Sequence, residues 1–155
     1  MKIIFLDLDG VICTRFHRLI EVNGNHFCPL NKRCIRNVNK ITDATDAKIV
    51  ISSCWRIGER WESLIQYFKE CGIKAEIIGK TPILREADRI RGDEIQEWLN
   101  ENPTESFAII DDDSDMGELL PFLVQTETRK GLTDKQVDEA IKILNEVDNS
   151  NKFML

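Results

Sequence analysis

The chain has 155 residues, a length that fits one domain and leaves little room for a second. Its composition, 42 % hydrophobic and 31 % charged residues, excludes wholesale disorder and a fibrous protein. The net charge of −6 excludes a protein that coats nucleic acid by bulk electrostatics. Residues 1–60 nevertheless hold ten Lys/Arg against six Asp/Glu, so we expect a basic surface in this part of the chain.

Apolar patterning predicts strands and helices that alternate along the chain. Continuous apolar runs are typical of strands buried in a parallel sheet, and apolar residues three and four apart are typical of helices packed on it. Asn23-Gly24 is a strong hairpin signal, and Thr133-x-x-Gln136 matches a capping box. In chain order the predicted elements are a strand over Lys2–Leu8, a hairpin over Leu19–Cys28, a helix with the stripe Leu30–Ile41, a strand over Ala47–Ser52, a helix with the stripe Trp61–Phe68, a strand over Ala75–Gly79, a helix over Ile90–Leu99, strands over Phe107–Asp111 and Phe122–Gln125, and a helix with the stripe Val137–Leu144.

This alternation predicts an α/β fold, a Rossmann-like three-layer core with a parallel sheet of about five strands. We expect one domain over residues 1–155, with a small β-hairpin flap at approximately residues 11–28. Ligands bind at the carboxyl ends of the strands in such sheets. Three of the predicted strands end in polar residues, which are Asp7, Ser52 and Asp111.

No apolar run approaches the roughly 18 residues of a membrane-spanning helix. The apolar stretch in MKIIFLDLD is shorter than the roughly 7–15 residues of a signal-peptide core. We therefore expect a cytoplasmic protein without a membrane partner. The five cysteines, an odd number without a CxxC pair, are expected to be free thiols in that compartment.

Two acidic groups follow predicted strands. In Asp7-Leu8-Asp9-Gly10, residues i and i+2 of an extended chain point the same way, and Gly10 lets the chain turn sharply. The second group is Asp111-Asp112-Asp113-Ser114-Asp115, a sequence that by itself is typical of an acidic surface loop. Brought together at one sheet edge, these carboxylates repel unless a cation neutralises them, and oxygen ligands of this kind suit Mg²⁺.

The third polar group is Ser52-Ser53-Cys54-Trp55-Arg56. A hydroxyl at a strand end can hold a phosphoryl oxygen, and Arg56 would add positive charge; the alternative is a serine that caps a helix. A serine-hydrolase triad has no support, because the chain has no GxSxG motif and only two histidines.

These residues resemble the four motifs of the haloacid dehalogenase-like (HAD) phosphohydrolases, over nearly the whole chain. The sequences that carry the resemblance are DLDGV, the serine-ended strand, a basic residue and a strand closed by two aspartates. SSCWR, RGDEIQEWL and IIDDDSD resemble more particularly small bacterial and phage members. Those include domains of RNA-repair proteins and the 3′-phosphatase half of phage polynucleotide kinase-phosphatase.

The resemblance implies a Mg²⁺-dependent mechanism with an aspartyl-phosphate intermediate. Asp7 would be the nucleophile and Asp9 the general acid and base. Asp7, Asp111 and Asp112 would form the Mg²⁺ site together with Asp9, whose backbone carbonyl commonly binds the metal in this family. Which of Asp111 and Asp112 binds it directly is left open.

The resemblance also implies residues that bind the phosphoryl group. Ser52 would hold one of its oxygens, with Ser53 as the alternative, and Gly10 and Arg56 would contact the substrate. The family usually has a lysine in its third motif.

This chain offers four basic residues for that position, which are Lys80, Arg85, Arg89 and Arg91. We expect Arg91, at the start of a predicted helix, to fill it and to stabilise the phosphoryl transition state. Arg89 is the main alternative.

Most HAD enzymes carry a cap domain, for which this chain has no room: about twenty residues separate Gly10 from the first predicted helix, and about a dozen separate Gly79 from Arg91. An open site suits a terminal phosphate on a large substrate, so we expect an RNA or DNA end. A phosphoprotein or nucleotide phosphatase is the alternative, and the oligomeric state is left open.

Two hypotheses without catalysis remain as alternatives. The first is a binding module stabilised by zinc, for which the region of the flap offers five candidate ligands. Their spacings match no standard zinc pattern: Cys13, His17, His26, Cys28 and Cys34. The second hypothesis is a HAD-like protein that only binds a ligand in the same pocket. The presence of Asp9 argues against it, because a pure binder needs no general acid.

Overall fold

Five parallel strands form the central sheet of the protein, whose computed structural model describes residues 1–15, 18–58 and 60–146. The strands are β1 (Lys2–Leu6), β4 (Lys48–Ile51), β5 (Ile77–Lys80), β6 (Ser106–Asp111) and β7 (Leu123–Gln125). Their order across the sheet is β5-β4-β1-β6-β7, and every neighbouring pair is parallel. The predicted five-stranded parallel sheet is confirmed.

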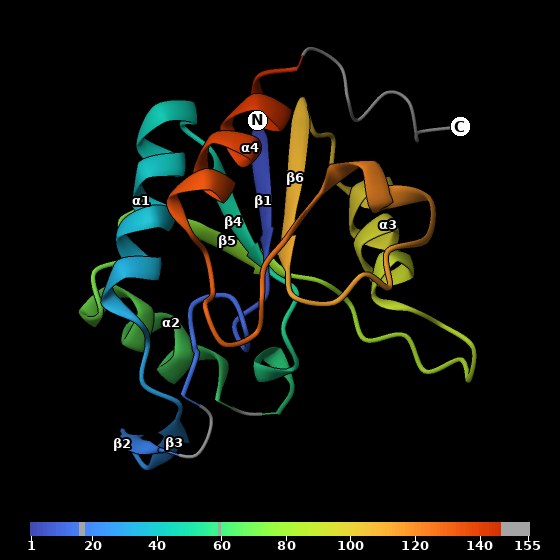
Figure 1. The fold of residues 1–155 in the computed structure, drawn as a ribbon. Coiled ribbons are helices and arrows are strands. Elements are labelled where there is room, and N and C mark those ends of the chain that lie inside the picture. The colour runs from blue at the N-terminus through green and yellow to red at the C-terminus, as the bar shows by residue number, and fades with distance from the viewer. Residues whose placement is uncertain (16–17, 59, 147–155) are drawn as a thin grey trace.

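Helices cover both faces of this sheet and make the three layers expected from the sequence (Figure 1). The four α-helices are α1 (Lys32–Thr45), α2 (Trp61–Glu70), α3 (Arg91–Glu101) and α4 (Asp134–Asn145), and two short 3₁₀ helices are η1 (Cys54–Arg56) and η2 (Gly117–Phe122). Apolar residues of α1, α2 and α4 pack on one face, and those of α3 and η2 pack on the other. Among the described residues, no helix is long and apolar enough to cross a membrane.

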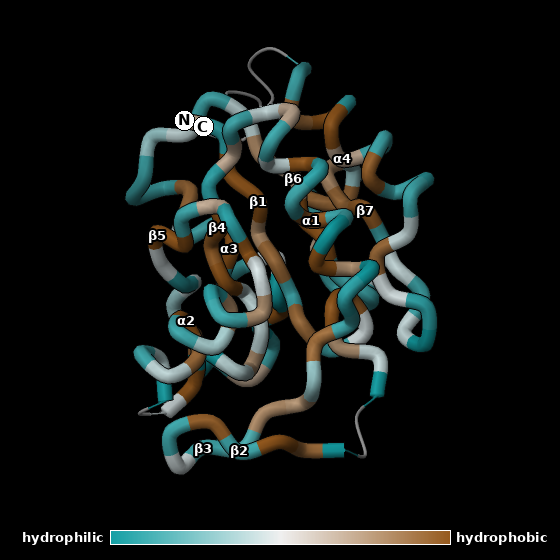
Figure 2. The backbone as a smooth tube through the Cα atoms, turned by 90° about the vertical axis from the view of Figure 1, so that its left-hand side faces the viewer, coloured by the Kyte–Doolittle hydropathy of each residue, from teal (hydrophilic) through white to brown (hydrophobic). Residues whose placement is uncertain are grey.

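The central strand β1 shows why the sheet forms. Ile4 and Leu6 belong to the core under α1, α2 and α4, whereas Ile3 and Phe5 belong to the core under α3. Phe5 meets Trp98 of α3 edge-on, with ring centroids 5.4 Å apart. The hydrophobic stretch is visible in the middle of the molecule (Figure 2). A strand that is buried on both faces needs this continuous apolar run, and its end delivers the following residues to the middle of the sheet edge.

The predicted flap is a two-stranded hairpin, β2 (Ile20–Val22) and β3 (Asn25–Phe27). Asn23 and Gly24 form its turn with φ angles of 51° and 80°, values that an Asn-Gly pair tolerates. The hairpin lies at the end of the molecule where the sheet strands finish (Figure 1). In the described residues between β1 and α1 it is the whole insertion, so no cap domain stands over this end.

The prediction that all five cysteines are free thiols is wrong for two of them. Cys13, just after β1, is disulfide-bonded to Cys28, just after the hairpin, with their Cα atoms 6.3 Å apart. The hairpin returns the chain to the loop that it left, which brings the two residues together across 15 positions of sequence. Cys34, Cys54 and Cys71 are free.

Candidate active site

The polar residues that follow β1, β4 and β6 meet at one edge of the sheet, as the sequence predicted. Strands β4 and β6 flank β1, so their carboxyl ends lie on either side of it. The Asp7 N–H donates to the carbonyl of Ile110 at 3.0 Å, and the Ser52 N–H donates to the carbonyl of Leu6 at 3.1 Å. These backbone bonds fix Asp7 between Ser52 on one side and Asp111 on the other.

Three carboxylates converge at this edge: Asp7, Asp111 and Asp112 each offer an oxygen, and these atoms lie within 4.8 Å of one another. One oxygen of Asp111 accepts from the Asp113 N–H at 2.9 Å. The other accepts no hydrogen bond from the described residues and makes an ion-pair contact with Arg91 at 3.6 Å. Asp112 accepts from the Thr128 hydroxyl at 2.9 Å. A set of hard oxygen donors, one of them buried and without a hydrogen bond, fits Mg²⁺.

Gly10 lets Asp112 reach this cluster. Its φ of +80° is in the left-handed region, and a Cβ at this position would lie 2.2 Å from a carboxylate oxygen of Asp112. The Gly10 N–H donates to the carbonyl of Cys13 at 2.8 Å, and the Gly10 carbonyl accepts from the Thr126 hydroxyl at 2.6 Å. Because both main-chain groups bond within the protein, the geometry supports a packing role for Gly10 rather than the expected substrate contact.

Arg91 brings positive charge to the same cluster from the first residue of α3. Its Nη1 lies 3.3 Å from a carboxylate oxygen of Asp7 and 3.6 Å from one of Asp111. The same nitrogen donates to the carbonyl of Ser52. The guanidinium therefore contacts residues at the carboxyl ends of three different strands.

The other candidates for the third motif point elsewhere. Arg89 pairs with Glu94 at 3.2 Å, and Lys80 lies over the Trp61 ring, 4.8 Å from its centroid. Arg85 lines an exposed hollow in the loop before α3. Of the four basic residues, the geometry supports only Arg91 at the site.

Burial is the main cause of the raised pKa values in the three-carboxylate cluster. It raises the pKa of Asp7 to about 6, against the opposing effect of Arg91. It raises the pKa of Asp111 to about 8, and the negative charge of Asp7 adds to this shift. Burial disfavours the charge on Arg91, but Asp7 and Asp111 outweigh it and raise the Arg91 pKa. One arginine does not neutralise three buried or half-buried carboxylates, so the metal-free site retains protons that a bound cation would displace.

Asp9 lies apart from the three-carboxylate cluster. Both of its oxygens accept from the indole N–H of Trp55 at 3.1 Å. Trp55 stacks on Phe27 of β3, with ring centroids 5.6 Å apart, so the hairpin supports the residue that orients Asp9. Burial raises the pKa of Asp9, which the Trp55 hydrogen bond opposes. The carboxylate of Asp9 is thus held by Trp55 outside the three-carboxylate cluster, and only its backbone remains for the expected metal contact.

The two adjacent serines have different roles. Ser53 accepts from the Trp55 N–H at 3.2 Å and caps η1. It is therefore the helix-capping serine that the sequence predicted as the alternative for this motif. Ser52 is fully buried, and its hydroxyl has no hydrogen-bond partner in the described part of the chain. The geometry therefore supports Ser52 for a phosphoryl oxygen and leaves Ser53 to shape the loop.

Arg56 does not offer its charge to the pocket as expected. Its side chain is only 2 % exposed and bonds entirely within the protein. The partners of its three nitrogens are the carbonyls of Ser52, Ser53, Thr81 and Pro82 and the carboxylate of Glu94. These five bonds use all five guanidinium donors, so the geometry corrects the expected substrate contact to a structural role.

Glu94 of α3 is a residue that sequence reasoning missed. Its buried carboxylate pairs with Arg56 at 2.9 Å and with Arg89 at 3.2 Å, and it accepts from the Leu84 N–H at 3.1 Å. These contacts tie the serine loop to the start of α3, which carries Arg91. The sequence did hold a signal, because Glu94 lies on the apolar stripe of the predicted helix, four residues before Trp98.

Glu94→Gln is expected to destabilise the protein by about 3 kcal/mol, because removing one partner leaves buried arginine charge uncompensated. Urea denaturation measures the loss. Glu97→Gln, an exposed position on the same helix, is the matched control and should leave the free energy of unfolding nearly unchanged. Equal stability of the two variants would contradict a structural role for Glu94.

The zinc alternative has no ligand set among the described residues. Cys13 and Cys28 are consumed by the disulfide, and Cys34 is buried. His17 lies outside the described residues. In the described part of the chain, the only group of three or more metal-ligating side chains is the acidic one.

A five-stranded parallel sheet with a three-carboxylate cluster at its carboxyl edge is consistent with a HAD-like core. Comparison with family models gives a match to the HAD domain in Swiss Army Knife RNA repair proteins over residues 3–137, and the chain belongs to that family. A HAD-type phosphohydrolase is the activity that this membership suggests. Searches of curated proteins and of solved structures gave no match.

Proposed function

We propose that the protein is a Mg²⁺-dependent phosphomonoester hydrolase that works through an aspartyl phosphate on Asp7. The observation that carries the proposal is the convergence of Asp7, Asp111 and Asp112 within 4.8 Å, with Arg91 at 3.3 Å from Asp7. Carboxylates in this arrangement bind a divalent cation, and the arginine offers charge to a phosphoryl group.

The reaction has two displacements at phosphorus. In the first, an oxygen of Asp7 forms a bond to phosphorus, the bond to the leaving oxygen breaks, and Asp9 gives that oxygen a proton. In the second, Asp9 takes a proton from water, whose oxygen attacks phosphorus and releases inorganic phosphate. Asp7 regains its carboxylate, and Asp9 ends in its original protonation state.

Ser52 and Arg91 stabilise the charge that develops on the phosphoryl oxygens. The Ser52 hydroxyl lacks a partner in the described structure and is free to donate to one of them. Asp7, Asp111 and Asp112 would hold Mg²⁺, which when bound neutralises the carboxylates and the phosphoryl charge. Trp55 holds the Asp9 carboxylate apart from Asp7, Asp111 and Asp112, which leaves it to exchange a proton with the leaving oxygen and with water.

The proposed substrate is a terminal phosphate on a nucleic acid. The described insertion after β1 is a hairpin rather than a cap, so a large substrate can reach the site. The first 60 residues carry an excess of basic over acidic side chains in a protein of net charge −6. The family is that of HAD domains in RNA repair proteins, which favours a nucleic-acid end over a metabolite as the substrate.

The substrate class is tested by comparing kcat/KM for RNA and DNA oligonucleotides with a 3′- or 5′-phosphate, a mononucleotide and a phosphopeptide. We expect the 3′-phosphorylated oligonucleotide to be the best substrate in the presence of Mg²⁺. A higher kcat/KM for the mononucleotide or the phosphopeptide would favour the alternative substrates. Hydrolysis of none of them would favour a domain that only binds its ligand.

A further inference from the structure

A basic groove crosses the N-terminus of α1, outside the residues of the proposed catalytic site. Two adjoining hollows form it, with volumes of about 340 and about 390 Å³, and both are lined by Thr14, Arg15, Asn31 and Arg33. Because they share these residues, the two hollows adjoin, and together they form one concave basic surface. We define the basic groove by its six cationic residues, which are Arg15, Arg18, Lys32, Arg33, Arg129 and Lys130.

Most of the charge of the groove is not neutralised by the protein; the exception is Lys130, which pairs with Glu127 at 3.2 Å. No acidic residue lines either hollow. Within the described residues, no ion pair involves Arg15, Arg18, Lys32 or Arg129, and each of these side chains is exposed. In a protein of net charge −6, such a concentration of unpaired cations leaves a local site for an anion.

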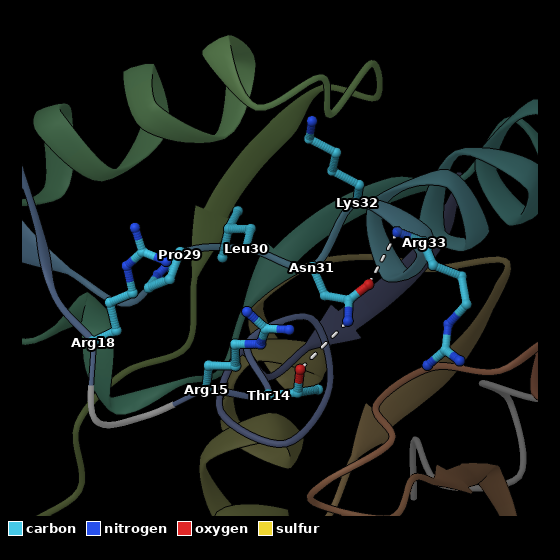
Figure 3. Close-up of a pocket in the computed structure, with 8 residues that line it drawn as sticks. All are labelled: Thr14, Arg15, Arg18, Pro29, Leu30, Asn31, Lys32 and Arg33. Atoms are coloured by element: carbon cyan, nitrogen blue, oxygen red, sulfur yellow. Dashed lines mark hydrogen bonds between the residues drawn. The ribbon is translucent and has the colours of Figure 1, made fainter.

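The cations come from three separate segments and lie at intervals along the groove. Figure 3 shows Arg15 and Arg18 beside Pro29 and Leu30, with Arg33 on the other side of Asn31. Asn31 caps α1 through the N–H groups of Arg33 and Cys34 and donates to the Thr14 hydroxyl at 3.4 Å, so the floor of the groove is held in place.

Two loops connect the groove to the acidic cluster. Arg15 follows Asp7 of the cluster by eight residues, so their Cα atoms are at most about 29 Å apart. On the other side, Arg129 directly follows Thr128, whose hydroxyl donates to Asp112 at 2.9 Å. A chain with its end at Asp7 therefore reaches the groove within a few nucleotides.

We propose that the basic groove binds the backbone phosphates of a single nucleic-acid strand whose terminal phosphate lies at Asp7. The inference rests on the proposed function for the position of that end. Cations spaced along a concave groove match a chain of repeated phosphates, whereas a single free phosphate would occupy one hollow and a membrane surface would need a flat or convex patch. Phosphate contacts of this kind position a strand without reading its sequence.

Binding is tested with a fluorescein-labelled RNA 10-mer that ends in a 3′-hydroxyl, which excludes any contribution from a terminal phosphate. We expect Arg15→Gln/Arg129→Gln to weaken binding by roughly tenfold in fluorescence anisotropy, because charge-assisted phosphate contacts are lost. The slope of log Kd against log salt should fall by about 1.4, since each phosphate contact on a single strand contributes about 0.7.

The matched control is Arg36→Gln/Lys142→Gln, which removes the same charge from exposed positions on α1 and α4 outside the groove. Equal Kd values and salt slopes for the two double variants would overturn the proposed groove. Tighter binding of phosphatidylserine vesicles or of a multiply phosphorylated peptide than of RNA would also overturn it.

Activity separates this inference from the proposed function. The ratio of kcat/KM for a 3′-phosphorylated 10-mer to that for p-nitrophenyl phosphate should fall about tenfold in the groove variant and stay constant in the control. A wild type that hydrolyses neither substrate contradicts the proposed function, while the anisotropy result still decides the groove. A wild type that hydrolyses both, with an unchanged ratio in the groove variant, contradicts the groove alone.

Discussion

Asp7→Asn is expected to abolish phosphatase turnover, because an amide nitrogen or oxygen is too weak a nucleophile to displace the leaving oxygen from phosphorus. Asp7 lies 3.3 Å from Arg91 and within 4.8 Å of carboxylate oxygens of Asp111 and Asp112. Its replacement therefore removes the attacking atom without removing the residues that would hold the phosphoryl group. Turnover of p-nitrophenyl phosphate with Mg²⁺ is the measurement.

The control for this variant is Asp113→Asn, an exposed position of the same acidic loop that lies outside the three-carboxylate cluster. It should retain activity within a few-fold of the wild type. Asp7→Asn should also melt at a higher temperature than the wild type in EDTA, because the raised pKa of Asp7 shows that the neutral side chain is favoured there. A wild-type rate for Asp7→Asn would contradict the covalent mechanism.

Removal of divalent metal is the second change with a large expected effect. EDTA should abolish turnover, because the uncompensated carboxylates of Asp7, Asp111 and Asp112 would repel a phosphate dianion. Added Mg²⁺ should stabilise the folded protein by roughly 2.7 kcal/mol at a concentration a hundredfold above its Kd. For a chain of this size, this corresponds to a rise in Tm of about 5–10 °C.

The Mg²⁺ effect should depend on pH in a defined direction. Burial raises the pKa of Asp7 to about 6 and that of Asp111 to about 8, so the folded metal-free protein binds more protons than the unfolded chain above about pH 4. Its stability therefore falls as pH rises from about 4 to 8. Mg²⁺ requires the ionised carboxylates, so its Tm shift should be larger at pH 8 than at pH 5.5.

Differential scanning fluorimetry in EDTA and in Mg²⁺ at the two pH values measures this dependence. Na⁺ at matched ionic strength controls for general screening of charge. A Tm shift that is equal at both pH values, or turnover that survives exhaustive chelation, would contradict the assignment of the cluster as a metal site.

The sheet could be predicted from the sequence because its strands are buried. The continuous apolar run of β1 contacts a core on each face, and the same physical demand produces the runs of β4 and β6. The strand ends were less accurate: the predicted strand over Lys2–Leu8 ends at Leu6, and the predicted strand over Ala75–Gly79 begins at Ile77. Strand ends depend on pairing with neighbours, which local sequence does not specify.

The acidic cluster could be predicted because parallel strands finish at the same edge of the sheet. Asp7 and Asp111 follow adjacent strands, so their meeting needed only the fold class and the strand ends. Asp9 could not be placed by the same rule. Because β1 ends at Leu6, the alternation of side chains does not extend to Asp9, whose carboxylate turns toward Trp55 instead of the cluster.

Two features depended on contacts between distant segments. The role of Arg56 is set by Glu94, which lies 38 positions away and reaches it only after α3 packs on the sheet. The pairing of Cys13 with Cys28 requires the hairpin to return to its starting point. Neither residue pair has a spacing that predicts its contact, so the sequence indicated a substrate-binding arginine and free thiols.

Detection of a phosphoenzyme tests the central claim most directly. The protein is mixed with excess 3′-phosphorylated oligonucleotide and Mg²⁺, quenched in acid within milliseconds and analysed by intact and peptide mass spectrometry. The account predicts a mass increase of one phosphoryl group, localised to Asp7 and absent from Asp7→Asn. Turnover with no phosphoryl group on the wild-type protein at any quench time, or with the group on another residue, would contradict it.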